Sequence, residues 1–185
     1  MNPVAIRMRP LNKKESKHPG SKGVWRTLPK YHSVAQTTED GRPLPERVVG
    51  RNFFTYDRAF GGKSTNSDIY DGVVRDVVRD ALGGRNGAVF AYGQTGSGKT
   101  YTMEGPAESP GVNSRAINEV FRLAEERGED YEVEISASML EIYNETIRDL
   151  LVPRSAETQK LEVRLTGDGS VHVPNLSAQR VNQPS

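Results

Sequence analysis

The chain has 185 residues, enough for one globular domain, and its 25 Lys and Arg nearly balance its 24 Asp and Glu. This balance argues against a globally basic nucleic-acid binder, and the absence of cysteine excludes disulfide scaffolds, cysteine-ligated metal sites and thiol catalysis. Because no apolar run approaches the roughly 20 residues of a membrane span, and the N-terminus lacks the apolar core of a signal peptide, we expect a soluble intracellular protein with no membrane and no nucleic-acid partner.

The first sixty residues predict short strands separated by loops. Val4–Met8 is rich in β-branched residues and predicts a strand. Residues 11–50 are rich in Lys, Ser, Gly, Pro and Thr, which predicts loops with one short strand near Val24–Leu28. The aromatic segment Phe53–Phe60 predicts a further strand, which a pair of glycines ends.

A helix is predicted next. Ser67 is a suitable N-cap, and Gly83 and Gly84 are suitable terminators. Apolar residues recur between them at the three- and four-residue spacing of one helix face, and charged residues occupy the other face. The apolar face consists of Ile69, Tyr70, Val73, Val74, Val77, Val78, Ala81 and Leu82. We assign this stripe to the core.

The segment that follows alternates between apolar runs and helical patterns. Ala88–Tyr92 has the composition of a buried parallel strand. A helix is expected from Gly98 through Met103, and another over residues 117–124.

The last third predicts mainly strands. Tyr131–Met139 alternates as a strand, whereas Asn144–Leu151 indicates a short helix. Leu161–Leu165 and Val171–Val173 flank a Gly-Asp-Gly turn, which predicts a hairpin. The order of elements indicates an α/β fold: a layered sheet with helices on both faces.

One motif carries chemistry. Residues 93–100 fit the pattern G-x-x-x-x-G-K-[ST] between a predicted strand and a predicted helix, as a phosphate-binding loop (P-loop) requires. Glycines let the backbone wrap around an anion, and the amides of residues 95–100 are expected to point inward. Lys99 can reach the β- and γ-phosphates, and the Thr100 hydroxyl can ligate Mg²⁺. The predicted nucleotide contacts are Gly93, Gln94, Thr95, Gly96, Ser97, Gly98, Lys99 and Thr100.

Groups for cleaving the triphosphate are not evident. No apolar strand after the motif is predicted to end in an Asp that could hold Mg²⁺, because Asp149 and Asp168 are expected at a helix end and in a turn. Glu141 is interpreted as a packing or hydrogen-bonding residue. The three histidines are scattered, so no zinc site is expected, and Ser97 has no His–Asp pattern for nucleophilic catalysis.

Three blocks of sequence resemble the kinesin motor domain. Residues 88–105 (AVFAYGQTGSGKTYTMEG) are similar to its P-loop region, residues 7–10 (RMRP) to its first-strand R-x-R-P motif, and residues 138–151 (SMLEIYNETIRDLL) to its strand-to-helix signature. The resemblance covers essentially the whole chain, which corresponds to about the first half of such a motor. It therefore implies a partial motor domain over residues 1–185, with the family's switch I and switch II regions absent.

The resemblance implies an α/β core that binds ATP or ADP with Mg²⁺, hydrolyses ATP and moves along microtubules, in the cytoplasm and on the cytoskeleton. It implies that Arg7, Arg9 and Pro10 border the adenine and that Tyr101 packs near it. A guanidinium plane, a Pro ring and an aromatic ring would form a stacking platform for a base. A lean towards the minus-end-directed, C-terminal-motor subgroup comes from the block around residues 143–151 and the final hairpin.

The missing switch regions lead us to expect that the chain, with Lys99 as its one predicted catalytic residue, hydrolyses ATP poorly or not at all. Microtubule binding and dimerisation are expected to need segments outside these residues. A non-catalytic, split motor-like module that binds nucleotide or a partner is the alternative. A small P-loop kinase is a third hypothesis, which the long segment before the loop argues against.

Overall fold

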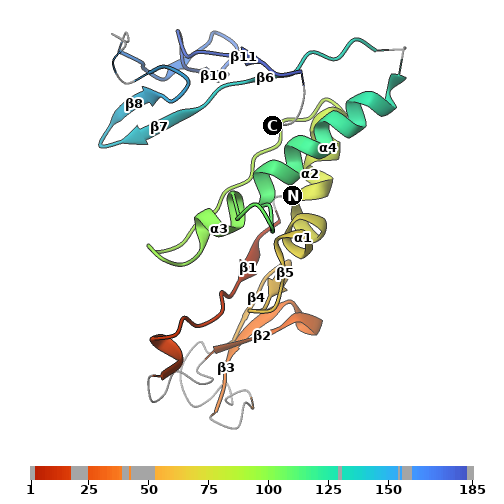
Figure 1. The fold of residues 1–185 in the computed structure, drawn as a ribbon, viewed down its shortest axis with the longest axis vertical. Helices are drawn as coiled ribbons and strands as arrows, with labels where there is room; N and C mark the ends of the chain where they lie inside the picture. The colour runs from red at the N-terminus through yellow and green to blue at the C-terminus, as the bar shows by residue number, and fades with distance from the viewer. Residues whose placement is uncertain are drawn as a thin grey trace. The chain divides into compact units, whose positions relative to one another are not determined.

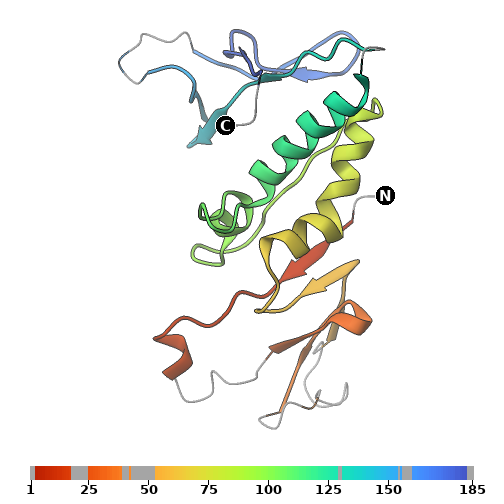
Figure 2. The same ribbon diagram turned by 45° about the vertical axis from the view of Figure 1, so that its right-hand side comes forward.

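The computed structural model describes residues 3–17, 25–38, 42, 53–128, 131–153, 155 and 160–182. The chain divides into two compact units, Met1–Leu123 and Ala124–Ser185, and each is described by itself (Figures 1 and 2).

The first unit begins with a parallel pair of strands. β1 (Ala5–Arg7) pairs with β5 (Arg58–Phe60), and Ile6 lies opposite the buried Ala59. The amide of Met8 extends the pairing by donating to the Phe60 carbonyl at 2.9 Å. The strand predicted at the N-terminus is therefore confirmed, and the R-x-R-P block begins at its last residue, Arg7.

A second sheet of the first unit is antiparallel, in the order β2 (Trp25–Leu28), β3 (Ser33–Gln36) and β4 (Phe53–Thr55). β2 confirms the short strand expected near Val24–Leu28. β3 lies within the segment predicted to be loops, and two short 3-10 helices, Glu15–Lys17 and Pro29–Tyr31, lie there as well.

The predicted strand over residues 53–60 is two strands, β4 and β5, which belong to different sheets. Between them the chain turns, because the Tyr56 amide donates to the His32 carbonyl at 2.8 Å and the Asp57 amide to the Val4 carbonyl at 2.9 Å. The aromatic pattern is continuous, but the segment pairs first with β3 and then with β1. The pattern alone does not show this change of partner strand.

The predicted helix runs through α1 (Asn66–Ile69), a π-helical stretch (Tyr70–Val74) and α2 (Arg75–Leu82). Its N-cap is Thr65, so the expectation that Ser67 caps it is wrong. The Thr65 hydroxyl accepts from the Asp68 amide at 3.1 Å, and the Asp68 carboxylate accepts from the Thr65 amide at 2.8 Å. This reciprocal capping box satisfies two backbone donors at once, which a cap at Ser67 would leave unpaired.

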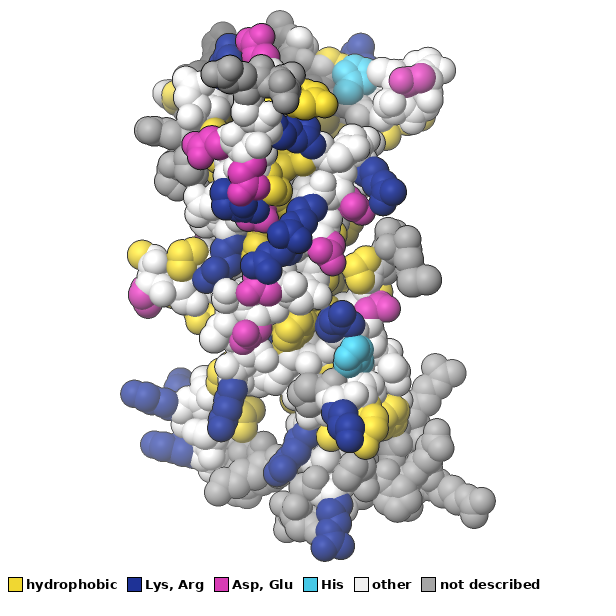
Figure 3. Space-filling view, turned by 90° about the vertical axis from the view of Figure 1, so that its right-hand side faces the viewer, with side chains coloured by type: hydrophobic (Ala, Val, Ile, Leu, Met, Phe, Trp, Pro, Cys, Tyr) yellow, Lys and Arg dark blue, Asp and Glu magenta, His cyan; other side chains and the backbone are white. Residues whose placement is uncertain are grey.

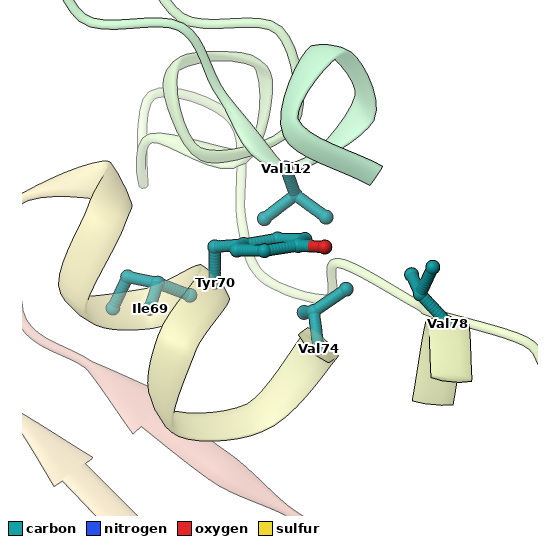
Figure 4. Close-up of a cluster of buried hydrophobic side chains, with 5 residues drawn as sticks. All are labelled: Ile69, Tyr70, Val74, Val78 and Val112. Carbon is teal, nitrogen blue, oxygen red and sulfur yellow. The ribbon is translucent and has the colours of Figure 1, made fainter. Parts of the chain in front are cut away.

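The core of the first unit lies between this helix and α4 (Val112–Glu126), as Figure 4 shows. Four residues of the predicted apolar stripe are buried in it, which confirms the assignment of that part of the stripe. The buried cluster consists of Ile69, Tyr70, Val74, Val78 and Val112. Gly72 allows close packing on β5, because a Cβ there would lie 2.9 Å from the Phe60 ring.

Charged side chains cover the outer faces of these two helices. Glu119 of α4 pairs with Arg79 of α2 at 3.6 Å and with Arg122 at 2.8 Å. The hydrogen bond from Arg122 lowers the pKa of Glu119. Figure 3 shows acidic and basic side chains interspersed on this face, in agreement with the near-zero net charge.

Residues 88–92 form no strand in the part of the chain that the structure describes, contrary to the prediction. Phe90 is 89% exposed and Tyr92 is fully exposed, so the apolar run is not buried either. A strand requires hydrogen bonds to a neighbouring strand, and residues 88–92 pair with none of the strands that the structure describes.

Where the structure describes it, the second unit has three small antiparallel pairs of strands. β6 (Ser136–Ala137) pairs with β11 (Gln179–Arg180), and this short strand is what remains of the strand predicted over residues 131–139. β9 (Arg164–Leu165) pairs with β10 (Val171–His172) and confirms the hairpin predicted around the Gly-Asp-Gly turn.

The third pair, β7 (Leu140–Tyr143) and β8 (Thr146–Asp149), replaces the short helix predicted over residues 144–151. Asn144 and Glu145 have φ values of 48° and 60°. Positive φ at both central residues is the geometry of a type I′ turn, whose twist matches that of the flanking strands. The turn therefore sets the register between β7 and β8, in a segment whose residue spacing suggested a helix.

Among the described residues the strands form separate sheets of two or three strands. The single layered sheet with helices on both faces stays a prediction. In the same residues, no helix combines the length and apolar character needed to cross a bilayer.

Candidate functional site

The glycine-rich motif forms a loop immediately before α3 (Lys99–Met103), which confirms the helix expected there. Gly96 and Gly98 have φ values of 76° and 98°, in the left-handed region that disfavours other residues. A Cβ on Gly93 would lie 2.6 Å from the Ser97 Oγ. Gly93 has a φ of 155°, so the loop requires glycine for backbone conformation at three positions and, at Gly93, for space as well.

The backbone donors of the loop are largely available. The Ser97 amide donates to the Gln94 carbonyl at 3.1 Å and closes a turn. Within the described residues, the other amides from Thr95 to Thr100 have no protein acceptor. Several unpaired donors on one short loop are suited to holding a multiply charged anion.

Lys99 lies at the centre of this arrangement. Its half-buried ammonium donates to the Gly93 carbonyl at 2.8 Å and to the Gln94 carbonyl at 3.0 Å. Both acceptors are neutral, and no carboxylate contacts this ammonium in the described residues. The positive charge is thus positioned by the loop itself and stays uncompensated, as an anion site requires.

The Thr100 hydroxyl is exposed, at the start of α3. The described residues contain no group of three or more His, Asp or Glu that could hold a metal ion by itself. Mg²⁺ typically takes one or two protein ligands together with substrate phosphates. A single hydroxyl at this position fits a magnesium ion only when the ion is bound together with phosphate oxygens.

Arg7 and Tyr101 are brought together across the first unit. The Arg7 guanidinium carbon lies 5.3 Å from the centroid of the Tyr101 ring, a cation–π distance. Arg7 also donates to the Thr102 hydroxyl at 2.8 Å and to the Ser64 carbonyl at 3.1 Å. Burial lowers the pKa of this guanidinium. Tyr101 is 49% exposed, so part of its ring remains accessible.

Arg9 lies near the loop, whereas Pro10 lies against Gly62. The Arg9 Cβ lies 3.9 Å from the position of a Cβ on Gly98. Its guanidinium, however, forms a bidentate pair with Glu15 at 2.7 and 2.5 Å. The hydrogen bond from Arg9 lowers the pKa of Glu15 to about 2. The Pro10 backbone packs 3.4 Å from the position of a Cβ on Gly62.

The carboxylates weighed as Mg²⁺ ligands in the sequence have structural partners instead. Asp149 ends strand β8 and not a helix, and it accepts from the Leu151 amide at 2.9 Å and the Ser177 amide at 2.8 Å. These bonds, led by that of Ser177, lower its pKa. Glu141 is 53% exposed and lies opposite Arg148 in the β7–β8 pair.

Asp168 is the other carboxylate in this group. It accepts from the Thr166 hydroxyl and, at 3.0 Å, from the Ser170 amide, and these bonds lower its pKa to about 2. It therefore serves the β9–β10 turn in which the sequence places it.

The sequence analysis missed Asn66, the first residue of α1. Its side chain is fully buried and accepts from Arg7 Nη1 at 2.7 Å. It also donates to the Tyr101 carbonyl at 3.1 Å and to the Ser109 carbonyl at 2.9 Å. The capping-box spacing of Thr65 and Asp68 could have placed Asn66 on the first helical turn, but no sequence signal gives its three partners.

Comparison with known proteins agrees with these features. The kinesin motor-domain family matches residues 7–185. Kinesin-like protein KIN-14Q of Arabidopsis thaliana is 37% identical over 94% of this chain and 14% of its own length. Kinesin-like protein KIN-14E of Oryza sativa is 44% identical over 72% of this chain and 12% of its own length. Kinesin-like protein tea2 of Schizosaccharomyces pombe is 36% identical over 98% of this chain and 27% of its own length.

The chain thus spans between 12% and 27% of the length of these three relatives. The family predicted from the sequence is confirmed, and KIN-14 proteins, the group that includes C-terminal motors, are among the relatives.

Proposed function

The chain belongs to the kinesin motor-domain family, and we propose that it forms the ATP-binding part of a microtubule motor. The family has an α/β fold of the P-loop NTPase type and generally binds ATP or ADP with Mg²⁺. Its members in the comparison are proteins of the microtubule cytoskeleton. We propose the same association, in the cytoplasm, for the protein to which these residues belong.

The observation that carries the proposal is the loop at residues 93–100. It combines unpaired backbone amides with one ammonium held only by neutral carbonyls. We propose that these amides and Lys99 bind the β- and γ-phosphates, and that Thr100 ligates Mg²⁺ together with phosphate oxygens. Lys99 would exchange its two carbonyl acceptors for phosphate oxygens, which are stronger partners for an ammonium.

The base would lie beside Tyr101. Its ring is half exposed and backed by the Arg7 guanidinium, which leaves a surface on which an adenine can stack. Arg9 and Pro10 would border this surface through their backbone and aliphatic atoms, because the Arg9 guanidinium is engaged by Glu15.

We further propose that the 185-residue chain binds ATP without efficient turnover. Hydrolysis needs a carboxylate that holds Mg²⁺ and a group that orients the attacking water. Among the described residues, no carboxylate contacts Lys99 or Thr100, and Asp149 and Asp168 accept hydrogen bonds from their own segments. The same observation favours the second candidate function, a module of this family that binds nucleotide without cycling.

The layered α/β sheet of the family is part of the proposal. Residues 88–92 are apolar and exposed and lead directly into the loop. A strand that ends in a phosphate-binding loop is the usual context of this motif. We propose that this segment is a strand of that sheet in the motor.

Nucleotide binding is tested by calorimetric titration of Mg-ATP into the chain and two variants. Lys99→Ala removes the loop cation and should weaken binding at least tenfold. Lys160→Ala is the matched control, because it removes the same charge from the other unit. The Lys160 side chain is 87% exposed. Equal affinities of a folded Lys99→Ala variant and the parent chain would reject the site.

The two candidate functions differ in their response to microtubules. In the longer protein to which these residues belong, a motor predicts cosedimentation with microtubules that depends on the bound nucleotide. A nucleotide-binding module without motor function predicts ATP binding that microtubules leave unchanged. Brisk microtubule-stimulated ATP hydrolysis by the 185-residue chain would contradict the proposed lack of turnover.

A further inference from the structure

Asn66 lies at the junction of three segments that are far apart in the sequence. It is fully buried, and its side-chain amide makes hydrogen bonds to Arg7, to the Tyr101 carbonyl and to the Ser109 carbonyl. Since the oxygen accepts once and both amide hydrogens are donated, its hydrogen-bonding capacity is largely used. One side chain thus joins β1, α1, α3 and the loop that follows α3.

The end of α3 explains why the Tyr101 carbonyl needs this partner. The Glu104 amide donates to the Thr100 carbonyl at 2.8 Å, and the Gly105 amide donates to the same carbonyl at 3.3 Å. The Gly105 amide is the donor that the Tyr101 carbonyl would receive in a regular α-helix. Asn66 supplies the replacement donor, and it therefore fixes the turn of the helix that carries the Tyr101 ring.

The Arg7 side of the junction is fixed by the same residue. Arg7 Nη1 donates to the Asn66 oxygen at 2.7 Å and to the Thr102 hydroxyl at 2.8 Å. These bonds hold the guanidinium 5.3 Å from the Tyr101 ring centroid. Asn66 is consequently bonded both to the cation of the pair and to the backbone of the aromatic residue.

We propose that Asn66 is a positioning residue for the nucleotide base, which holds Arg7 and Tyr101 as one rigid stacking surface. This inference rests on the proposed function, because it concerns the base of the same nucleotide. The hydrogen-bond partners of Asn66 include neither the amides of the phosphate loop nor Lys99. A change at Asn66 should therefore alter binding of the base and not binding of the phosphates.

An amide is required at this position for chemical and steric reasons. Arg7 needs an acceptor, and the two carbonyls need donors, which only an amide of this size offers together. A Cβ on Gly105 would lie 2.8 Å from the Asn66 nitrogen, so there is little space around it. Asp at residue 66 would keep the acceptor and the volume but would place a carboxylate against two carbonyl oxygens.

The test compares binding of Mg-ATP with binding of magnesium tripolyphosphate, which has the phosphates and no base. Both are titrated calorimetrically into the parent 185-residue chain and into the Asn66→Asp and Asn118→Asp variants. Asn118 is exposed on α4 and serves as the matched control. We expect Asn66→Asp to lower the affinity for ATP about tenfold and to change the affinity for tripolyphosphate less than twofold. The control variant should change neither affinity.

If Asn66 had only a structural role, its substitution would lower the affinities for both ligands equally, and that result would overturn the inference. An unchanged affinity for ATP would also overturn it. A parent chain that binds tripolyphosphate and ATP equally well would overturn the inference but retain the phosphate site. A parent chain that binds neither would overturn the proposed function and the inference with it.

Folding is monitored by circular dichroism. Should Asn66→Asp fail to fold, Asn66→Ser gives the same comparison with a smaller group that still has one donor. A second arm introduces the Asn66 change into Tyr101→Ala. Because the stacking surface is then already lost, the Asn66 change should not alter the ratio of the two affinities further. A further loss of the same size would overturn the inference.

Discussion

The left-handed backbone of the phosphate loop gives a quantitative prediction for Gly96→Ala. Gly96 has a φ of 76°, and a Cβ there would meet no atom within 4 Å. The cost of alanine is therefore conformational and not steric, about 1–2 kcal/mol for an L-residue in this region.

This free energy has to appear in one of two measurements. If the free loop of the variant relaxes, the left-handed conformation is restored only on binding, and the ATP dissociation constant rises about 5–30-fold. If the surrounding loop keeps the residue left-handed, ATP affinity is retained and the free energy of unfolding falls by about 1–2 kcal/mol. Calorimetry gives the loss in ATP-binding free energy, and urea unfolding gives the loss in unfolding free energy. We expect the two losses to add up to about 1–2 kcal/mol.

Gly96→Asn is the matched control, because asparagine tolerates the left-handed region better than alanine. Its combined loss should be clearly smaller than that of Gly96→Ala, although its side chain is larger. If Gly96→Ala alters neither quantity, or if Gly96→Asn costs more than Gly96→Ala, the loop does not depend on a left-handed residue here and the reasoning is refuted.

Two further predictions concern the first unit. The Tyr70 hydroxyl is buried and has no hydrogen-bond partner among the described residues, so Tyr70→Phe should raise the free energy of unfolding by about 1 kcal/mol in urea denaturation; a loss of stability would reveal a bond to this hydroxyl in solution. The Glu15 pKa is lowered to about 2 from its ordinary value of 4.5 by Arg9. Because the folded value is the lower one, the stabilising contribution of this pair is present above pH 4.5 and is lost as the pH falls towards 2. Carboxyl NMR titration of Glu15 should give a midpoint near 2, and a midpoint near 4.5 would show that the pair is open.

The sequence predicted best where local geometry depends on residue type. Glycines at fixed spacing, followed by Lys99 and Thr100, specified a loop and the start of a helix, and both are found. The apolar stripe of the α1–α2 region predicted a buried face because helical periodicity alone sets which residues share a side.

Prediction from the sequence failed where two local patterns favour different structures. Residues 144–151 carry spacing that suits a helix, but the conformation of Asn144 and Glu145 closes a two-residue turn and selects strands. The cap at Thr65 was missed because several polar residues precede this helix, and only the reciprocal bonds with Asp68 identify the one that caps.

The sequence by itself determined the glycine-rich loop before α3 and the family to which the chain belongs, since both follow from residue types at short, fixed spacings. Only the tertiary structure decided that Arg9 is bound by Glu15, that Arg7 faces Tyr101, and that Asn66 is hydrogen-bonded to both Arg7 and the Tyr101 carbonyl. Arg7 and Tyr101 are separated by more than ninety residues of chain. Contacts of that separation depend on how helices and strands pack, and a buried amide has no sequence pattern that identifies its partners in advance.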